Sequence, residues 1–214
     1  LPGDHPNIAS GINNLASFLQ GQGELVEAEA LYRESLAMRR RLFRGDHTSV
    51  ATGLNNLALL LQREDQYAEA EAMIRESLAM RRRLFKGDHP SVALDLNNLS
   101  LLLRDKGDLE ASLKVGQDAV DMFTRTHGKD YWLTGYARMG RGRTLVRMRR
   151  FGAAEKELLE AERVMGAPKG VPAGRHKSCL EAVVQLYEAW NKAAPSAGHA
   201  ASVASWKAKL DGAS

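Results

Sequence analysis

Apolar and polar residues alternate along the chain with the period of an α-helix. In the first such stretch, apolar side chains recur at spacings of three and four: Ile8, Ile12, Leu15, Ala16 and Leu19. This spacing places them along one face of an amphipathic helix. Two glycines within residues 20–24 interrupt the pattern, and a second helical pattern starts at Leu25. The stretch therefore predicts two helices joined by a short turn.

The helix pair recurs with a period of 42 residues. The tripeptide Gly-Asp-His at 3–5 returns at 45–47 and 87–89, and the segment 33–43 is repeated letter for letter at 75–85. A single hairpin cannot bury both sides of its apolar stripe, so such units have to stack on one another. The repeat predicts an all-α fold: about five helix-turn-helix hairpins in a right-handed superhelix, with the first helix of each pair on the inner face.

The period divides the chain into three regular units and two divergent ones. The expected bounds are 3–44, 45–86 and 87–126 for the regular units, 127–166 for a degenerate fourth unit, and 173–211 for a divergent hairpin. In the fourth unit Arg141 takes the place of a core leucine, so either its aliphatic stem lies along apolar surface or its helix is rotated. We expect the last hairpin to close the C-terminal end, because terminal repeats are usually atypical.

Two further patterns recur with the units. An aspartate precedes each first helix, and its side chain is expected to accept bonds from the free N–H groups there: Asp4, Asp46 and Asp88. Small residues recur where the helices of a pair should cross: Ala16 with Ala28, Ala58 with Ala70, and Ser100 with Ser112. These positions are expected to let the two helices of each pair approach closely.

Composition and charge narrow the function. Apolar residues make up 44% of the chain, and the formal net charge is only +4, so we do not expect nucleic acid as the ligand. The single cysteine excludes an internal disulfide and fits a reducing compartment. Neither a signal peptide nor an apolar run of about 20 residues is visible. We therefore expect a cytoplasmic protein with no membrane partner.

The first residues of the chain match the junction between units, so we expect that an earlier unit has been cut away. Its removal would expose the apolar flank of the first helix around Ile8, Ile12 and Phe18. Exposed apolar patches of this kind tend to mark protein contacts. We therefore expect self-association through the truncated N-terminal end.

Four motifs of the period resemble the kinesin-light-chain subtype of the tetratricopeptide repeat (TPR). They are Gly-Asp-His-Pro, Leu-Asn-Asn-Leu-Ala, Glu-Ala-Glu and Arg-x-Ser-Leu-Ala-Met-Arg, and the match is close over residues 3–126 and loose over 127–165. The resemblance implies a concave groove that holds an extended peptide. It also implies which asparagines bond to that peptide, namely the second of each Asn-Asn pair: Asn14, Asn56 and Asn98.

The same resemblance implies that Arg39 and Arg81 meet acidic residues of the peptide. Unit three has Phe123 at the arginine position, and unit four has Gly140 at the asparagine position. The implied groove is therefore shorter than the array.

The closing stretch of the chain, Leu180 to Trp190 followed by Trp206 to Leu210, is similar to the C-terminal ends of bacterial serine/threonine protein kinases that carry these repeats. This similarity implies a catalytic domain upstream. The chain itself shows no Gly-rich nucleotide loop, catalytic Asp loop or metal-binding Asp motif of a kinase. We therefore do not expect it to be an enzyme.

The asparagines and arginines each allow a structural reading beside the functional one. An amide has both donors and an acceptor, so it can pair with a peptide main chain, or it can bond to a neighbouring helix and fix the repeat spacing. The triplets 39–41 and 81–83 cannot all face a groove, because adjacent helical residues point about 100° apart. Ion pairs in solvent, with Glu34 and Glu76 in reach, are the alternative to groove contact.

Arg143 and Arg147 form a second basic cluster, one helical turn apart in unit four. They are suited to an acidic peptide, a phosphate or nucleic acid, or they form only a solvated basic face.

No cofactor, metal or catalytic site is expected. The histidines His5, His47 and His89 belong to separate units about 10 Å apart, too far for one zinc ion with ligands at about 2.1 Å, and are expected to pack at helix starts. Cys179 follows a basic run that could lower the pKa of its thiol, although an idle cysteine is the more common case. No nucleophile, base and orienting group occur together.

Taken together, the residues favour a non-catalytic scaffold for protein–protein interaction, which binds an extended acidic segment in its groove. The alternative is a regulatory or substrate-docking module of a larger bacterial signalling enzyme, such as a serine/threonine protein kinase. A helical array that binds nucleic acid is the least favoured reading.

Overall fold

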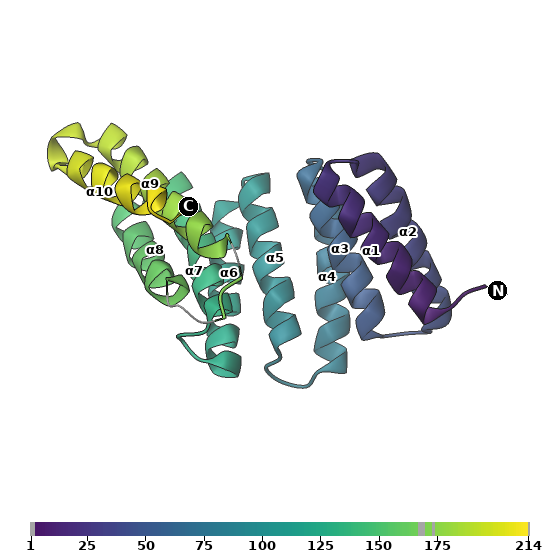
Figure 1. Cartoon of the computed structure of the whole chain (residues 1–214). Coiled ribbons are helices and arrows are strands. Elements are labelled where there is room, and N and C mark those ends of the chain that lie inside the picture. Colours follow the sequence, from purple (N-terminus) through teal and green to yellow (C-terminus); the bar gives the residue numbers. More distant parts are fainter. Residues whose placement is uncertain (1–2, 167–169, 173, 214) are drawn as a thin grey trace. The chain divides into compact units, whose positions relative to one another are not determined.

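The computed structural model of the chain describes residues 3–166, 170–172 and 174–213. Within them, helices are joined by short turns and no β-strand occurs (Figure 1). The helices are α1 (Pro6–Gln22), α2 (Leu25–Leu42), α3 (Thr48–Arg63), α4 (Tyr67–Leu84), α5 (Pro90–Lys106), α6 (Leu109–His127), α7 (Trp132–Arg147), α8 (Phe151–Met165), α9 (Arg175–Ala193), the 3₁₀-helix η1 (Pro195–Ala197) and α10 (His199–Asp211). The all-α expectation is confirmed. Residue 173, the predicted start of the last hairpin, and the first two residues of the predicted junction lie outside the described residues.

The chain divides into two compact units, Leu1–Leu102 and Leu103–Ser214, with the division inside α5. In the first unit α1 packs against α2, α2 against α3, and α3 against α4. In the second unit α7 packs against α6, α8 and α9, and α9 packs against α10. Figure 1 shows α1 and α2 as neighbouring antiparallel helices. The helix pairs α1–α2 and α3–α4 are therefore present in the first unit, and α7–α8 and α9–α10 in the second.

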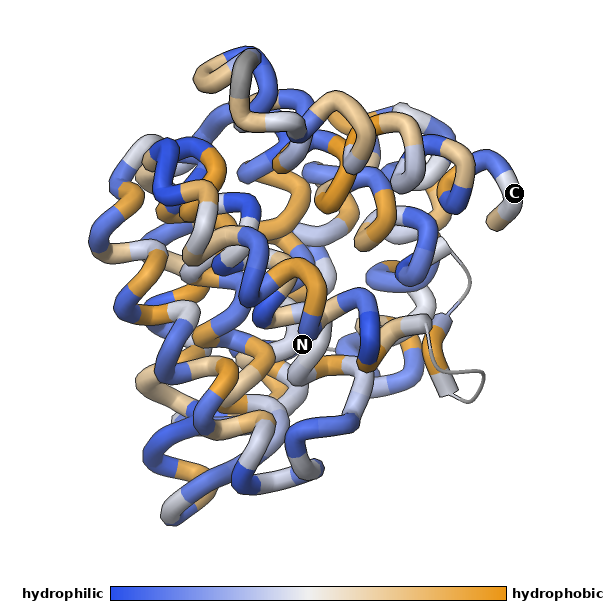
Figure 2. Tube along the Cα trace, turned by 90° about the vertical axis from the view of Figure 1, so that its left-hand side faces the viewer, coloured by the Kyte–Doolittle hydropathy of each residue, from blue (hydrophilic) through white to orange (hydrophobic). Residues whose placement is uncertain are grey.

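The helices are amphipathic, and apolar and polar stretches alternate along the trace (Figure 2). In the first unit the core is centred on α3 and α4, where Leu54, Leu57, Leu61 and Ile74 are each 0% exposed. Full burial of one such side chain contributes about 1.5–3 kcal/mol.

The first helix departs from this pattern, because the apolar residues of α1 are largely exposed. Leu15 is 50% exposed and Phe18 is 61% exposed. Their equivalents one period later, Leu57 and Leu60, are both 0% exposed. The difference follows from the stacking: α3 packs against α2 of the preceding pair, whereas among the described residues no earlier pair covers α1.

The small residues lie where the prediction placed them. Ala16, Ala28, Ala58 and Ala70 are 0% exposed. In the second unit the equivalent position is Gly142, where an added Cβ would lie only 2.5 Å from Cγ of Leu158 on α8. Close approach of the helices at these positions therefore depends on side chains no larger than those present.

The helix starts correct one expectation. The residue that caps α1 is His5 rather than Asp4, and its Nδ1 accepts from the N–H of Asn7 at 3.2 Å. In the second repeat His47 caps α3 in the same way, and its ring stacks on the ring of Phe43 with 3.7 Å between the centroids. Two of the three aspartates pair with arginines near the end of the second helix: Asp4 with Arg41, and Asp46 with Arg83, each at 2.6 Å.

The turn within a pair is shorter than predicted. The helix α1 runs to Gln22, so only Gly23 and Glu24 separate it from α2. Gly23 has φ +92°, a left-handed conformation that glycine adopts without strain, and its N–H bonds to the carbonyl of Gln20. The first three residues of the predicted break, 20–22, thus form the last turn of the helix.

Unit four accommodates Arg141 by pairing its charge. The carboxylate of Glu157 on α8 accepts from Arg141 at 2.5 Å and from Arg138 at 3.1 Å. The guanidinium groups therefore lie against α8 beside a counter-charge, an arrangement that neither predicted alternative for Arg141 included.

Candidate functional site

The three candidate asparagines lie at equivalent positions of α1, α3 and α5 in the first unit, and they differ in exposure. Asn14 is exposed, Asn56 is half-buried and Asn98 is 8% exposed. Exposure thus falls from the first repeat to the third.

The asparagines form a hydrogen-bonded ladder between repeats. Nδ2 of Asn56 donates to Oδ1 of Asn13 at 2.9 Å, and Nδ2 of Asn98 donates to Oδ1 of Asn55 at 3.2 Å. The second asparagine of one repeat is therefore tied to the first asparagine of the repeat before it. This geometry supports the structural role of the ladder, and it leaves the amide oxygens of Asn56 and Asn98 without a partner among the described residues.

A stripe that is open to solvent over much of its length runs along each first helix of this unit, and each candidate asparagine is part of it. On each helix the stripe consists of the asparagine, the residue four positions before it and the residue three positions after it. This spacing puts the three side chains on one helical face. On α3 the stripe holds Thr52, Asn56 and Leu59, and Leu59 is 38% exposed. The equivalent residues are Ser10, Asn14 and Ser17 on α1, and Leu94, Asn98 and Leu101 on α5. Hereafter these nine residues are called the asparagine face.

The arginines of the resemblance are buried between successive helices. Arg39 and Arg81 are each 6% exposed. Nη1 of Arg39 donates to the carbonyl of Ser49 at 2.9 Å, and Nη1 of Arg81 donates to the carbonyl of Ser91 at the same distance. Burial lowers the pKa of both guanidinium groups, because it penalises the charged form. Contact with a ligand is thus limited to a small exposed fraction of each side chain.

Asp95 on α5 is a functional candidate that the sequence analysis missed. Its carboxylate accepts from Arg81 at 2.7 Å and lies 2.7 Å from the hydroxyl of Ser77, and it also accepts from Asn55. Burial raises the pKa of Asp95 to about 6, although Arg81 opposes the shift. A break in the repeat marks this residue, because the equivalent position one period earlier is Gly53.

This break makes the two arginines chemically different. Arg81 faces the Asp95 carboxylate, whereas Arg39 faces Gly53, where an added Cβ would lie 3.6 Å from Cδ of Arg39. No carboxylate among the described residues lies within ion-pair distance of Arg39. Among the residues that the structure describes, Arg39 is therefore a buried cation held only by a backbone carbonyl.

Further arginines of the second helices form exposed ion pairs between repeats. Arg33 binds Glu69 through two hydrogen bonds of 2.8 and 3.0 Å, and Arg40 binds Glu76 through two of 2.8 and 2.9 Å. Glu76 belongs to the following repeat, so these pairs link successive second helices. Of the triplet residues, Arg40 thus forms an ion pair with Glu76, one of the two glutamates that the sequence offered.

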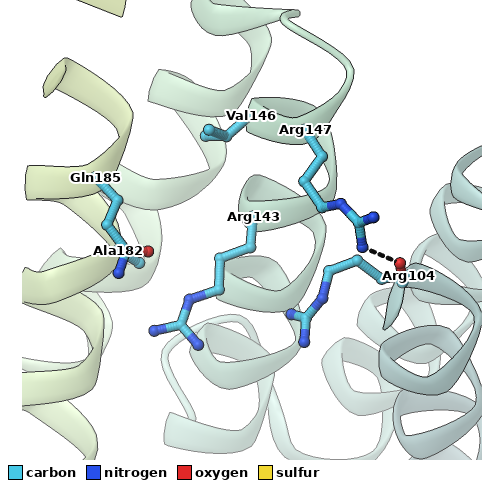
Figure 3. Close-up of a pocket in the computed structure, with 6 residues that line it drawn as sticks. All are labelled: Arg104, Arg143, Val146, Arg147, Ala182 and Gln185. Carbon is cyan, nitrogen blue, oxygen red and sulfur yellow. Dashed lines mark hydrogen bonds between the residues drawn. The ribbon is translucent and has the colours of Figure 1, made fainter. Parts of the chain in front are cut away.

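The two candidate arginines of the fourth repeat, Arg143 and Arg147, line a cavity of about 260 Å³. The cavity lies within the second compact unit, Leu103–Ser214. Its wall comes from the end of α5, from α7 and from α9, as Figure 3 shows: Arg104, Arg143, Val146, Arg147, Ala182 and Gln185. Nη2 of Arg143 donates to the carbonyl of Ser178 at 3.0 Å, and Nη1 of Arg147 donates to the carbonyl of Arg104. The structure thus brings the predicted arginines together with two polar residues, Arg104 and Gln185, that no sequence pattern singles out.

The histidines and the cysteine have structural roles. His89 repeats the geometry of His47, because its Nδ1 accepts from the N–H of Ser91 at 3.1 Å and its ring stacks on Phe85. Cys179 is 0% exposed, and burial raises the pKa of its thiol to about 12. The suggestion of a lowered thiol pKa is therefore wrong, because loss of hydration outweighs the nearby positive charges.

Neither a cluster of metal ligands nor a membrane span occurs among the described residues. No three His, Cys, Asp or Glu side chains there come close enough to hold a metal ion. Among the helices that the structure describes, none has the length and apolar character needed to cross a membrane.

Comparison with known proteins agrees with the repeat. The profile of the tetratricopeptide repeat matches residues 7–83 and 49–125, which together span more than half of the chain. No curated protein matches the chain.

Among solved structures, the TPR-like repeats of a Podosopora anserina kinesin light chain superpose with a TM-score of 0.75 at 17% identity, over 96% of this chain and 98% of that one. BtubC (BKLC) from P. vanneervenii gives 0.76 at 18%, over 97% and 82%. A Rap protein complexed with competence and sporulation factor gives 0.76 at 12%, over 94% of this chain but only 52% of that one. At identities this low, the superpositions show the fold alone. They confirm the predicted TPR solenoid class. None of these names refers to a kinase, so the kinase link stays a prediction.

Proposed function

The chain belongs to the tetratricopeptide repeat family, and from this premise we propose that it is a non-catalytic scaffold that binds an extended acidic segment of a partner protein along the asparagine face. One observation carries the proposal. The asparagine face keeps exposed side chains in register on α1, α3 and α5, while the opposite faces of α3 and α5 are buried.

The chemistry of the asparagine face suits an extended main chain. The ladder uses one donor of Asn56 and of Asn98, and their amide oxygens can still accept from peptide N–H groups. Leu59 and Leu94, both 38% exposed, add apolar contact beside them. An amide pairs with any main chain, so the choice of sequence must come from other groups.

Positive charge supplies the preference for acidic residues. Arg81 reaches the asparagine face, where its Nη2 donates to the hydroxyl of Thr52 at 3.3 Å, and Arg39, its equivalent one repeat earlier, has no carboxylate partner among the described residues. In the second unit Arg143 and Arg147 offer further positive charge to the same class of ligand. A site of this kind weakens as salt is added, because added ions screen exposed charges.

A direct test is fluorescence anisotropy with labelled peptides rich in Asp and Glu, with matched basic peptides, and with single-stranded oligonucleotides. We expect saturable binding of acidic peptides only. The variant Asn14→Ala should weaken binding about fivefold, the cost of one hydrogen bond of about 1 kcal/mol. Gln22→Ala, which removes an exposed amide of the same helix outside the asparagine face, serves as the control. Tight binding of oligonucleotides with no binding of peptides would overturn the proposal.

A second candidate is a regulatory or substrate-docking module of a larger bacterial signalling enzyme in the cytoplasm, such as a serine/threonine protein kinase. Two observations support it: the similarity of the closing stretch, and the Rap protein, of which this chain spans only about half. The full-length gene tests this second candidate. A kinase domain encoded before Leu1 supports the docking module, and an in-frame stop codon followed by a start codon near Leu1 rules the module out.

We also propose that the chain self-associates through the open side of α1. Ile8 and Phe18 are 48% and 61% exposed there, whereas the equivalent Val50 and Leu60 are 2% and 0% exposed beneath α2. A second copy of the chain would cover this apolar surface as the stacked repeat does. Sedimentation should therefore show a dimer or larger species whose fraction rises with concentration, and a monomer at high concentration would argue against it.

A further inference from the structure

The cavity at Arg104, Arg143 and Arg147 carries more positive charge than the protein itself neutralises. Nη2 of Arg104 pairs with Asp105 at 2.8 Å. Arg143 and Arg147 have no carboxylate within ion-pair distance among the described residues, and their hydrogen bonds go to backbone carbonyls. Glu181 attracts Arg143 only at longer range. The cavity therefore holds two uncompensated positive charges.

One hydrogen-bond donor of the cavity's arginines also has no acceptor among the described residues. Nε of Arg143 is buried and has no partner in the structure. A buried donor without a partner costs about 1–3 kcal/mol, so it is normally satisfied by the protein, by water or by a ligand. Burial and the charge of Arg104 both lower the pKa of Arg143, which shows that the guanidinium is held where its charge is unfavourable.

The shape of the cavity admits a ligand from outside. Figure 3 shows the Arg143 side chain extended between α9 and Arg104, with Gln185 on the opposite wall. Val146 and Ala182 contribute apolar surface beside these polar groups. The volume of about 260 Å³ is several times the roughly 30 Å³ that a water molecule occupies in the liquid, so a small charged group fits together with the atoms that carry it.

We propose that this cavity binds a phosphate monoester, carried on a phosphorylated side chain of the partner segment. Such a group carries about −1.5 to −2 charges at neutral pH, which matches the two uncompensated guanidinium groups. Two N–H groups of one arginine can each donate to a different phosphate oxygen, and the group has three such oxygens. A single carboxylate would leave one arginine uncompensated. The lining holds no aromatic ring on which a nucleic-acid base would stack.

Only the identity of the molecule that carries the phosphate, a partner segment, rests on the proposed function. Binding of phosphate by the cavity can be tested without a partner segment. The full chain is titrated with inorganic phosphate at a constant ionic strength maintained with sodium chloride, and binding is followed by amide chemical shifts. We expect saturable shifts at residues 143, 147 and 185. Equal shifts with chloride alone would overturn the proposal.

Variants then assign the binding to the arginines. Arg147→Gln should weaken phosphate binding at least tenfold, and this side chain is exposed, so its loss should leave folding intact. Arg143→Gln should have an equal or larger effect, and a thermal melt checks its fold, because Arg143 also bonds to Ser178. Arg150→Gln removes the same charge from an exposed residue outside the cavity and should bind as the parent does. Unchanged binding by Arg147→Gln would overturn the proposal.

Peptides identify the carrier. A peptide with one phosphoserine should bind at least tenfold more tightly than the same peptide with serine or glutamate, and Arg147→Gln should remove the difference. Equal binding of the glutamate peptide would refute a site for phosphate. A phosphopeptide that binds no better than inorganic phosphate would refute the peptide carrier and point to a small phosphorylated molecule. The acidic peptides that test the asparagine face bear no phosphate, so the two proposals fail separately.

Discussion

Asp95 shows how one residue changes the chemistry of a repeat that is otherwise nearly copied. The two preceding repeats have glycine at this position, Gly11 and Gly53, so their first helices bring no carboxylate to it. In the third repeat the carboxylate enters a buried network with Arg81, Ser77 and Asn55. The network satisfies the charges with one another, at the cost of removing a carboxylate from water.

The raised pKa of Asp95 predicts a pH dependence of stability with a definite sign. The pKa of this carboxyl is about 6 in the folded chain, against its ordinary value of 3.8, so the folded chain retains a proton that the unfolded chain releases. The associated stability is fully present below pH 3.8 and is lost as the pH rises through about 6. A difference of about 2 between the folded and unfolded pKa values corresponds to about 3 kcal/mol.

The variant Asp95→Asn isolates this effect, because asparagine does not titrate. Urea unfolding of both proteins between about pH 4 and pH 7 should show the parent losing stability relative to the variant, by about 2–3 kcal/mol over that range. Carboxylates with lowered pKa values, such as those of Asp46 and Glu69, give the opposite slope in both proteins and cancel in the difference. A difference that stays constant, or grows in favour of the parent, would refute the assignment.

At the scale of helices, the close approach of α7 and α8 depends on a missing side chain. The position held by Ala16 and Ala58 in the regular repeats is Gly142 here, and Leu158 fills the space above it. A Cβ at Gly142 would lie 2.5 Å from Cγ of Leu158, well inside van der Waals contact. The helix pair has therefore repacked around glycine and can no longer accept alanine without a shift.

Two identical substitutions in neighbouring helices test this packing. Gly142→Ala should destabilise the chain by about 1–3 kcal/mol through overpacking. Gly152→Ala, in α8, meets nothing within 4 Å and should stabilise the chain by up to about 1 kcal/mol, because alanine loses less backbone entropy on folding. Urea unfolding measures both, and equal effects or the reverse order would contradict the packing described.

The elements could be predicted from the sequence because hydrophobic spacing reports helices directly, as the pattern from Ile8 to Leu19 shows. The cap could not be assigned with the same certainty. Asp46 and His47 are adjacent and both can accept from free N–H groups, and the choice depends on which residue has extended backbone, here His47 with φ −149°. Which member of an arginine triplet is buried likewise depends on the rotation of the helix, and spacing alone does not give it.

At the scale of the whole molecule, the repeat period predicted the solenoid class but not how each candidate side chain is used. The asparagines form the predicted bonds between repeats, with the donors of Asn56 and Asn98 tied to the preceding repeat, and their pairing with a peptide stays a prediction. Arg104 and Gln185 escaped the sequence analysis because their positions in the cavity depend on how α5, α7 and α9 pack. Contacts between helices far apart in sequence leave no periodic signal.

The central claim is that a partner segment lies along the asparagine face of successive first helices. Site-specific photo-crosslinking to an acidic peptide tests it most directly, with the photoreactive residue placed at Leu59 on α3 or at the exposed Ala72 on α4. We predict that the peptide is captured from Leu59 and not from Ala72, and that excess unlabelled peptide abolishes capture. Capture from Ala72 alone, or equal capture from both helices, would contradict this claim.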